Sequence, residues 1–260
     1  MGAALNSFCN KMKVIAILLL LSSCASNKVL EGSDSNIDNT NDPFEHFNRF
    51  VFAVNQTFDK VLFEPVARGY RYITPDGMRS AVNNFFSNLS EPVSAINHVL
   101  SGNFEEAGTN MTRFMINSTY GIAGLNDIAS DFDLKPDSQD FGKTLATWGV
   151  GEGPYVMLPV LGGHNARDAV GVGVDYFIDP VNIATRDMDN TIFFLTIPRG
   201  IAKREQYLDL LAEMEKDSLD LYVTMREFTR QNRRFSVNRN NTDDLSAFNF
   251  DMDSFEDEEE

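Results

Sequence analysis

A short apolar run at residues 14–21 follows Lys11 and Lys13 and leads directly into Ser22-Ser23-Cys24. Positive residues, an apolar core and small residues before a cleavage point are typical of a bacterial export signal. A cysteine directly after Leu-Ser-Ser is typical of a lipobox, in which the thiol receives a diacylglyceryl group and the preceding segment is removed. We therefore predict that residues 1–23 are a signal peptide and that Cys24 is the acylated N-terminus of the mature chain.

The apolar run is too short to cross a membrane, because a spanning helix needs roughly 20 apolar residues. A plain secretory signal with a chance cysteine is the less favoured alternative. Each buried methylene group contributes about 0.8 kcal/mol, so two or three acyl chains on Cys24 would hold the domain on a bilayer. No aspartate follows Cys24, and this favours the outer membrane over inner-membrane retention. We expect a lipid-anchored protein on the periplasmic face of the outer membrane.

The rest of the chain divides into three parts by composition. Residues 24–41 are rich in Ser, Asn, Asp and Gly, which predicts a flexible tether. Residues 42–239 carry the apolar periodicity of a folded domain, and residues 240–260 are an acidic tail that we expect to be disordered. The net charge is −16, and the last 20 residues hold nine acidic residues and no basic one. This acidity disfavours nucleic acid as a partner.

The folded domain is predicted to be all-α, because its apolar residues recur at three- and four-residue steps and strand alternation is scarce. The first helix is predicted to use Asp42 as N-cap and Pro43 as first residue. An apolar stripe follows from Phe44 to Phe58, with further Phe residues off the stripe. The chain has 21 Phe against 7 Tyr and one Trp. This excess fits either a Phe-rich core or a surface that faces acyl chains.

Proline and glycine positions predict where the later helices end. A second helix is predicted to start near Thr74 and to break at Pro92, with short helices following over residues 93–102 and 103–121. Residues 129–142 are polar and predict a loop or small hairpin, the most mobile element of the domain. Glycines and prolines at residues 149–159 predict tight turns instead of a helix.

The C-terminal part is predicted to hold three more helices and one apolar run. The first opens at Asn165, and its internal Gly171 and Gly173 suggest close packing or proximity to lipid. The run at residues 192–195 suits a segment lying in one membrane leaflet, and a buried core turn is the equal alternative. The last helix ends in an arginine cluster, for which we favour a helix C-terminal charge role over a lipid-phosphate contact; the cluster is Arg226, Arg230, Arg233 and Arg234.

No catalytic constellation is recognisable in the sequence. His46, His98 and His164 lie far apart without metal-ligand spacing. A nucleophile elbow and a phosphate-binding loop are both absent from the sequence. The glycines at residues 149–153 lack the spacing and the βαβ setting of a dinucleotide fingerprint. We therefore expect a protein that is not an enzyme and that needs no metal and no cofactor.

Several motifs resemble those of the VacJ/MlaA family of outer-membrane lipoproteins, in order along about residues 42–235. They are Asp42-Pro43-Phe44-Glu45, Asn88-Leu89-x-Glu91-Pro92, Arg113-Phe114-x-x-Asn117, Phe141-Gly142-x-Thr144-Leu145, Gly149-Val150-Gly151-x-Gly153-Pro154-Tyr155, Arg167-Asp168 and Met225-Arg226-Glu227. The resemblance implies a ring-like bundle of short amphipathic helices embedded in one membrane leaflet. It further implies a channel through which mislocalised phospholipids leave the outer leaflet for a soluble periplasmic lipid carrier. Trimeric porins are the partners it implies.

The resemblance suggests candidate site residues but fixes none of them. We take the polar loop as a gate and the glycine-rich turns as channel wall, and the candidates are Asp131, Phe132, Phe141, Gly142, Trp148, Gly149, Gly151, Gly153, Pro154 and Tyr155. The membrane-facing candidates are Phe193 and Phe194. The alternative function is a structural or porin-binding envelope lipoprotein without transport activity. A lipid hydrolase is disfavoured because no nucleophile motif is present.

Overall fold

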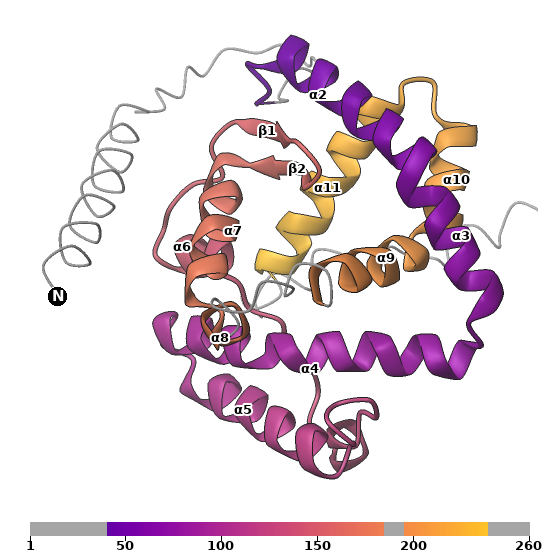
Figure 1. The fold of residues 1–260 in the computed structure, drawn as a ribbon. Helices are drawn as coiled ribbons and strands as arrows, with labels where there is room; N and C mark the ends of the chain where they lie inside the picture. Colours follow the sequence, from indigo (N-terminus) through magenta and orange to yellow (C-terminus); the bar gives the residue numbers. More distant parts are fainter. Residues whose placement is uncertain (1–40, 185–194, 239–260) are drawn as a thin grey trace, which may run out of the picture. The chain divides into compact units, whose positions relative to one another are not determined.

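The computed structural model describes residues 41–184 and 195–238, which belong to one compact unit starting at Asn41. The predicted signal, the tether up to residue 40, the acidic tail, Cys24, Phe193 and Phe194 lie outside the described residues. Helices make up most of this unit (Figure 1), and their bounds are α2 (Glu45–Phe58), α3 (Glu64–Ile73), α4 (Asp76–Leu100), α5 (Phe104–Thr119), α6 (Phe141–Thr147), α7 (Ala166–Ile178), α8 (Pro180–Ala184), α9 (Ile197–Gln206), α10 (Leu208–Asp217) and α11 (Leu221–Asn238).

The helices of this unit follow one another around a ring (Figure 1). Within it, α2 and α3 form one side and α4 packs along α5 on another. The ring is closed by contacts between elements far apart in sequence, since α9 lies against α3 and α4 while α11 lies against the hairpin. The ring-like, all-α prediction is therefore confirmed. None of the helices in the described residues is both long enough and apolar enough to span a bilayer.

The first helix starts later than its sequence pattern predicts and ends with the predicted stripe at Phe58. Phe44 is its N-cap residue and makes no side-chain cap, so the prediction that Asp42 caps the helix is wrong. The Asp42 carboxylate instead accepts hydrogen bonds from Asn48 at 2.8 Å, Tyr222 at 2.5 Å and Arg226 at 3.0 Å. Beyond α2, a π-helical segment at Asp59–Phe63 leads directly into α3.

Pro92 does not break α4, so the predicted helix end at this residue is wrong. A proline inside a helix loses one backbone hydrogen bond and costs about 3 kcal/mol. The packing of α4 on α5 offsets this cost. Glu91, next to Pro92, is buried and accepts a hydrogen bond at 2.9 Å from buried Arg113 of α5. Tertiary contacts thus override the local signal of the proline.

The small hairpin lies after the polar loop. Strand β1 (Tyr155–Leu158) pairs antiparallel with β2 (Gly162–Asn165). The polar loop contains only a 3₁₀ turn at Ala129–Phe132 before α6 begins, so it is a loop and no hairpin. Asn48 of α2 fixes the hairpin, since its side chain donates to the Tyr155 carbonyl at 3.0 Å and accepts from the Met157 amide at 2.9 Å.

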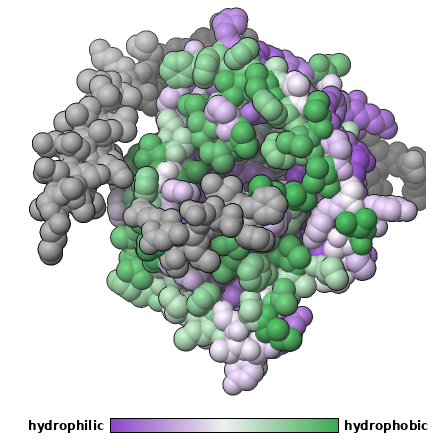
Figure 2. Space-filling model, viewed as in Figure 1, coloured by the Kyte–Doolittle hydropathy of each residue, from purple (hydrophilic) through white to green (hydrophobic). Residues whose placement is uncertain are grey.

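Burial follows an inverted pattern in the described residues. The largest fully buried side chains are one tyrosine and five polar residues, namely Tyr155, His98, Asn48, Asn97, Asn110 and Thr144. Large apolar side chains face outward, and on α2 Phe47 is 61% exposed and Phe50 67% exposed. Hydrophobic residues cover much of the face seen in Figure 2. This pattern supports the expectation that Phe-bearing surface meets acyl chains, because water would penalise it.

Candidate functional site

A cavity of about 420 Å³ lies between the first long helical segment, the hairpin and the C-terminal helices. Its lining residues come from α2, the π-helical segment Asp59–Phe63, α3, the hairpin, α9, α10 and α11. These elements are distant in sequence and meet only through the closure of the ring. The cavity therefore forms only in the tertiary fold, and no local sequence pattern predicts it.

One part of the cavity wall is apolar and adjoins the small core. Tyr155 and Met157 of β1 are buried and belong to the core cluster that contains Tyr222. Tyr155 and Tyr222 make an edge contact with ring centroids 6.3 Å apart. The remaining apolar lining comes from α2, α10 and α11, mainly Phe52, Leu208, Leu211, Leu221 and Met225. This apolar part of the lining is suited to contact with the hydrocarbon chains of a ligand.

The rest of the lining is charged with both signs. The cations are Lys60, Arg68, Arg204 and Lys216, and the carboxylates are Asp59, Glu64 and Glu215. Arg204 of α9 forms a two-pronged ion pair with Asp59, with distances of 2.6 and 2.7 Å. Lys60 pairs with Glu215 of α10. The cavity is thus amphipathic, with an apolar wall next to a group of ion pairs.

Two donor atoms on residues of the cavity lining lack hydrogen-bond partners within the described part of the chain, and neither atom has surface open to the cavity. They are Nη1 of Arg204 and the hydroxyl of Tyr155, and both atoms are buried. Burial, together with the negative charge of Asp42, raises the pKa of Tyr155 to about 12, so the phenol stays protonated. Buried polar groups are normally hydrogen-bonded, and an unpaired one needs an explanation.

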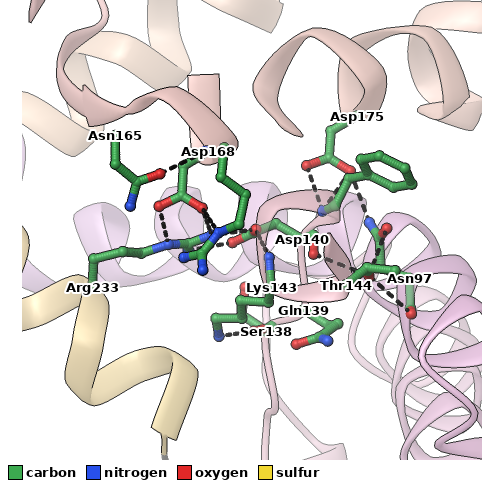
Figure 3. Close-up of polar contacts among 12 residues, drawn as sticks. Asn97, Ser138, Gln139, Asp140, Lys143, Thr144, Asn165, Asp168, Asp175 and Arg233 are labelled. Atoms are coloured by element: carbon green, nitrogen blue, oxygen red, sulfur yellow. Dashed lines mark hydrogen bonds and ion pairs between the residues drawn. The ribbon is translucent and has the colours of Figure 1, made fainter. Parts of the chain in front are cut away.

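A polar network fixes α6 against α7 and α11 (Figure 3). Arg233 of α11 contacts Asp140 at 2.6 Å and Asp168 at 2.7 Å. Burial alone would raise the pKa of Asp140, but hydrogen bonds and charge from Arg233, with support from Lys143, outweigh it and hold this pKa below its usual value. The network joins the start of α6 to the last helix by charge.

Asp175 of α7 holds the other side of α6 (Figure 3). Its carboxylate accepts from the Phe141 amide at 3.0 Å and from Asn97 of α4 at 2.8 Å. Burial raises the pKa of Asp175 above its ordinary value despite these hydrogen bonds. Phe141 and Gly142, two candidates from the sequence, therefore lie in a rigid polar joint, and neither lines the cavity.

Of the ten channel or gate candidates, Tyr155 alone lines the 420 Å³ cavity. Trp148 packs its ring against Phe141 and donates from Nε1 to the Leu100 carbonyl at 3.0 Å. The remaining wall candidates form the turn before β1, in which two glycines adopt positive φ; they are Gly149 (φ 83°), Gly151, Gly153 (φ 68°) and Pro154. Asp131 and Phe132 lie on the exposed 3₁₀ turn.

The predicted gate segment is tied to α4 and α5 by buried side chains. Arg113 donates to the Leu134 carbonyl, and Asn110 donates to the Asp137 carbonyl at 2.8 Å. Ser94 accepts from the Gln139 amide at 3.3 Å. Each contact supplies a hydrogen-bond partner for a backbone carbonyl or amide of this segment, which belongs to no helix or sheet. These contacts favour a braced segment over a mobile one.

The last turn of α11 holds no basic residue, so the expected C-terminal charge role of the arginine cluster is wrong, while the lipid-phosphate contact stays a prediction. Arg226 pairs with Asp42, Arg233 with Asp140 and Asp168, and Arg234 with Glu152. These carboxylates belong to distant segments, so the cluster joins the last helix to the rest of the ring. The sequence shows that the four arginines are close together in the chain, but it does not show which carboxylates they pair with. The cavity cations were also missed, because they are spread along the chain and meet only in the folded protein.

Comparison with known proteins gives consistent matches over most of the chain. Residues 40–236 match the family described as MlaA lipoprotein. An uncharacterised protein of Rickettsia typhi is 38% identical over 240 residues, covering 87% of this chain and 95% of the relative. An Escherichia coli protein named "Intermembrane phospholipid transport system lipoprotein MlaA" is 33% identical, covering 88% of this chain and 90% of the relative.

A solved structure resembles the fold as well as the sequence. It is described as the "structural basis for maintenance of bacterial outer membrane lipid asymmetry". Its sequence is 34% identical, and the match has a TM-score of 0.64 and covers 76% of this chain and 99% of that chain. Sequence and fold therefore agree on one group of relatives.

Proposed function

Because the chain belongs to the MlaA lipoprotein family, we propose that it transports phospholipid at the outer membrane and thereby maintains the lipid asymmetry of that membrane. The observation that carries the proposal is the inverted burial of a ring with an amphipathic cavity of about 420 Å³. Exposed Phe side chains suit immersion in one leaflet, while buried polar networks hold the ring together. A catalytic role needs a nucleophile or acid–base constellation, and the sequence offers none.

The proposed transport removes mislocalised phospholipid from the outer leaflet through the ring. A phospholipid needs a polar surface for its headgroup and an apolar one for its tails, and the cavity lining offers both. The lipid then passes to a soluble periplasmic lipid carrier, while the protein associates with a trimeric porin. Acylation at Cys24 keeps the ring on the periplasmic face of the outer membrane.

Within this proposal, Tyr155 is the wall residue with the strongest structural support. The turn at residues 149–154 positions Tyr155 at the start of β1, through a hydrogen bond of 2.9 Å between the Pro154 carbonyl and the Ala166 amide. The braced segment at residues 131–142 would act as a gate only if the joint at Asp140 and Arg233 opened. Phe193 and Phe194 remain the proposed membrane-facing residues.

The deciding experiment measures phospholipid in the outer leaflet of a deletion strain with and without this gene. We expect surface phospholipid to rise on deletion and to return to the starting level on complementation. A deletion that leaves surface phospholipid unchanged contradicts the transport proposal. It would favour a structural or porin-binding lipoprotein, for which porin should co-purify with the protein while phospholipid does not.

The lipid anchor gives a separate prediction for Cys24→Ala. The uncleaved or unacylated protein loses its hold on the outer membrane, since acyl chains contribute about 0.8 kcal/mol per buried methylene. We expect the variant to leave the outer-membrane fraction and to fail to complement the deletion, as judged by membrane fractionation and surface phospholipid. Full complementation by this variant would contradict the anchoring argument.

A further inference from the structure

The tip of the hairpin between β1 and β2 combines a strained backbone with apolar side chains. Val160 has a φ of 67°, and the neighbouring Leu161 is also apolar. We propose that Val160 is the entry residue for an acyl chain at the mouth of the cavity of about 420 Å³. The proposal rests on the transport function above and adds to it the place at which the hydrocarbon part of a lipid enters the cavity.

The backbone conformation of Val160 is unusual for its residue type. A positive φ lies in the left-handed region, where the branched side chain of valine crowds the main chain. Glycine and asparagine tolerate this region, and Gly162, two residues later, has a φ of 84°. Outliers of this kind are concentrated at functional sites. The fold thus keeps a valine at a position where glycine or asparagine would suit the backbone better.

Asn55 of α2 holds the strained residue in place. Its side chain donates to the Leu158 carbonyl at 2.9 Å and accepts from the Val160 amide at 2.9 Å. The same side chain therefore binds the hairpin tip on both sides of Pro159. Asn55 also lines the cavity, so these hydrogen bonds fix the tip relative to the cavity.

Val160 lies where the cavity meets the outer surface. It belongs to the cavity lining, and it is also 73% exposed. Met157, Leu211 and Met225 are further apolar residues of the lining. Hydrocarbon that passes from the outer surface to this part of the lining stays in contact with apolar groups, which is favourable. A polar side chain at position 160 would interrupt this contact.

Ile122 provides a comparison within the described residues. It is also β-branched, has a φ of 57° and is 65% exposed. It lies in the turn after α5 and is not part of the cavity lining. Backbone strain is therefore shared by Ile122 and Val160, whereas the position at the cavity belongs to Val160. Equivalent substitutions at the two residues separate the effect of strain from that of contact with a ligand.

The test measures where the acyl chains of a lipid reach in the full mature protein, reconstituted in nanodiscs. The probe is phosphatidylethanolamine with a photoactivatable diazirine either near the end of an acyl chain or on the headgroup, and mass spectrometry locates the adducts. The readout is the ratio of adducts on Met225, in the lining, to adducts on Phe47, which is exposed and outside the lining. We expect the chain probe to label Met225 more strongly than the headgroup probe does. Labelling of Met225 by the headgroup probe alone, or by neither probe, overturns the proposal.

Substitutions at the hairpin tip test the role of Val160 itself. Val160→Asn should lower the ratio of Met225 to Phe47 adducts about fivefold, because it places a polar amide in the path of the chain. It should also raise the urea midpoint, because asparagine tolerates the left-handed region. Val160→Ile keeps an apolar side chain and should keep the parent ratio. Leu161→Asn, outside the lining, should keep the ratio, and Ile122→Asn should raise the urea midpoint without changing the ratio.

The outcomes distinguish this inference from the transport function itself. An unchanged ratio in Val160→Asn overturns the entry role, and so does an equal loss in Val160→Asn and Leu161→Asn. If Val160→Asn leaves the ratio unchanged while the parent gene restores outer-leaflet asymmetry in the deletion strain, transport stands without this entry residue. If the parent gene fails to restore asymmetry while labelling of Met225 depends on Val160 as expected, the transport proposal falls and the entry residue stands.

Discussion

Single residues in this protein are constrained most tightly where helices touch. Gly142 at the start of α6 is such a position, because a Cβ there would lie 2.7 Å from Arg233 Nη2 and closer still to Asp168 Oδ1. Gly171 of α7 faces the same joint, and a Cβ on it would meet the backbone of Gly142 at 2.5 Å. Gly171 therefore serves close packing, which is one of the two alternatives that its position inside a helix left open.

The first prediction compares two glycines with opposite surroundings. Gly142→Ala should destabilise the protein by about 1–3 kcal/mol, because the added methyl group disrupts the Asp168–Arg233 ion pair. Gly173→Ala, in α7, meets nothing within 4 Å and should stabilise the helix by about 0.5–1 kcal/mol. Urea unfolding in detergent measures both changes. Equal effects of the two substitutions would contradict the packing argument.

The second prediction concerns acid stability at Asp140. Its pKa is lowered in the folded state, so its contribution is fully present above the ordinary aspartate pKa of about 3.9 and is lost as pH falls below that value. We expect Asp140→Asn to be less stable than the parent at pH 7 and to lose less stability on acidification. Urea unfolding at a series of pH values tests this. Parallel stability curves for the two proteins would contradict it.

At the scale of elements, buried ion pairs override local helix signals. The continuous α4 runs through Pro92 because Glu91 beside it is paired with Arg113 of α5. Burial raises the pKa of Glu91, even though the hydrogen bond and charge of Arg113 act against this rise. Arg113 also contacts Asp127 at 3.1 Å, beyond the end of α5. One guanidinium thus joins two helices and the loop that follows them.

The third prediction tests this joint between α4 and α5. Arg113→Ala should destabilise the protein by about 3–5 kcal/mol, because it leaves the Glu91 carboxylate buried without its cation. The double variant Glu91→Gln/Arg113→Met should be less destabilised than the single one. As an exposed control, Arg68→Ala breaks only the i,i+4 pair with Glu64 and should cost less than about 1 kcal/mol. A double variant that is as unstable as Arg113→Ala would argue against the charge-burial explanation.

At the scale of the whole molecule, polar side chains are buried and many large apolar side chains are exposed, which is the arrangement expected of a protein surrounded by lipid. Polar networks occupy the interior of the described unit, while Phe47 and Phe50 of α2 face outward. Hydrocarbon around the ring would cover these side chains at no cost to the polar interior. A ring of this kind can be held by hydrogen bonds and ion pairs because its outer surface needs no water.

The fourth prediction tests whether this apolar surface binds membranes without the acyl anchor. In a Cys24→Ser background, Phe47→Ser/Phe50→Ser should weaken partition into vesicles, since each exposed Phe contributes roughly 1.5–3 kcal/mol when buried. Stability should change little, because both side chains are exposed. Vesicle flotation and thermal unfolding measure the two quantities. Unchanged flotation would show that α2 does not contact the bilayer.

The sequence by itself determined the helical class, most helix positions and the family, while the lipid anchor at Cys24 stays a prediction. Periodicity and local motifs carry this information, because helix formation depends on residues three and four positions apart. Asn165 as the N-cap of α7 is one such success, with its side chain accepting from the Asp168 amide at 2.8 Å. Local rules failed at Asp42 and Pro92, where distant partners decided the outcome.

Only the tertiary structure decided which charges meet and which residues line the cavity. Arg204 and Asp59 are 145 positions apart in the chain, and Asp42 and Arg226 are 184 apart. No periodicity links such residues, since their contact depends on the closure of the ring. The sequence pattern also did not decide which way the Phe stripe of α2 faces. An apolar stripe shows which face of a helix avoids water, but protein or lipid can cover that face.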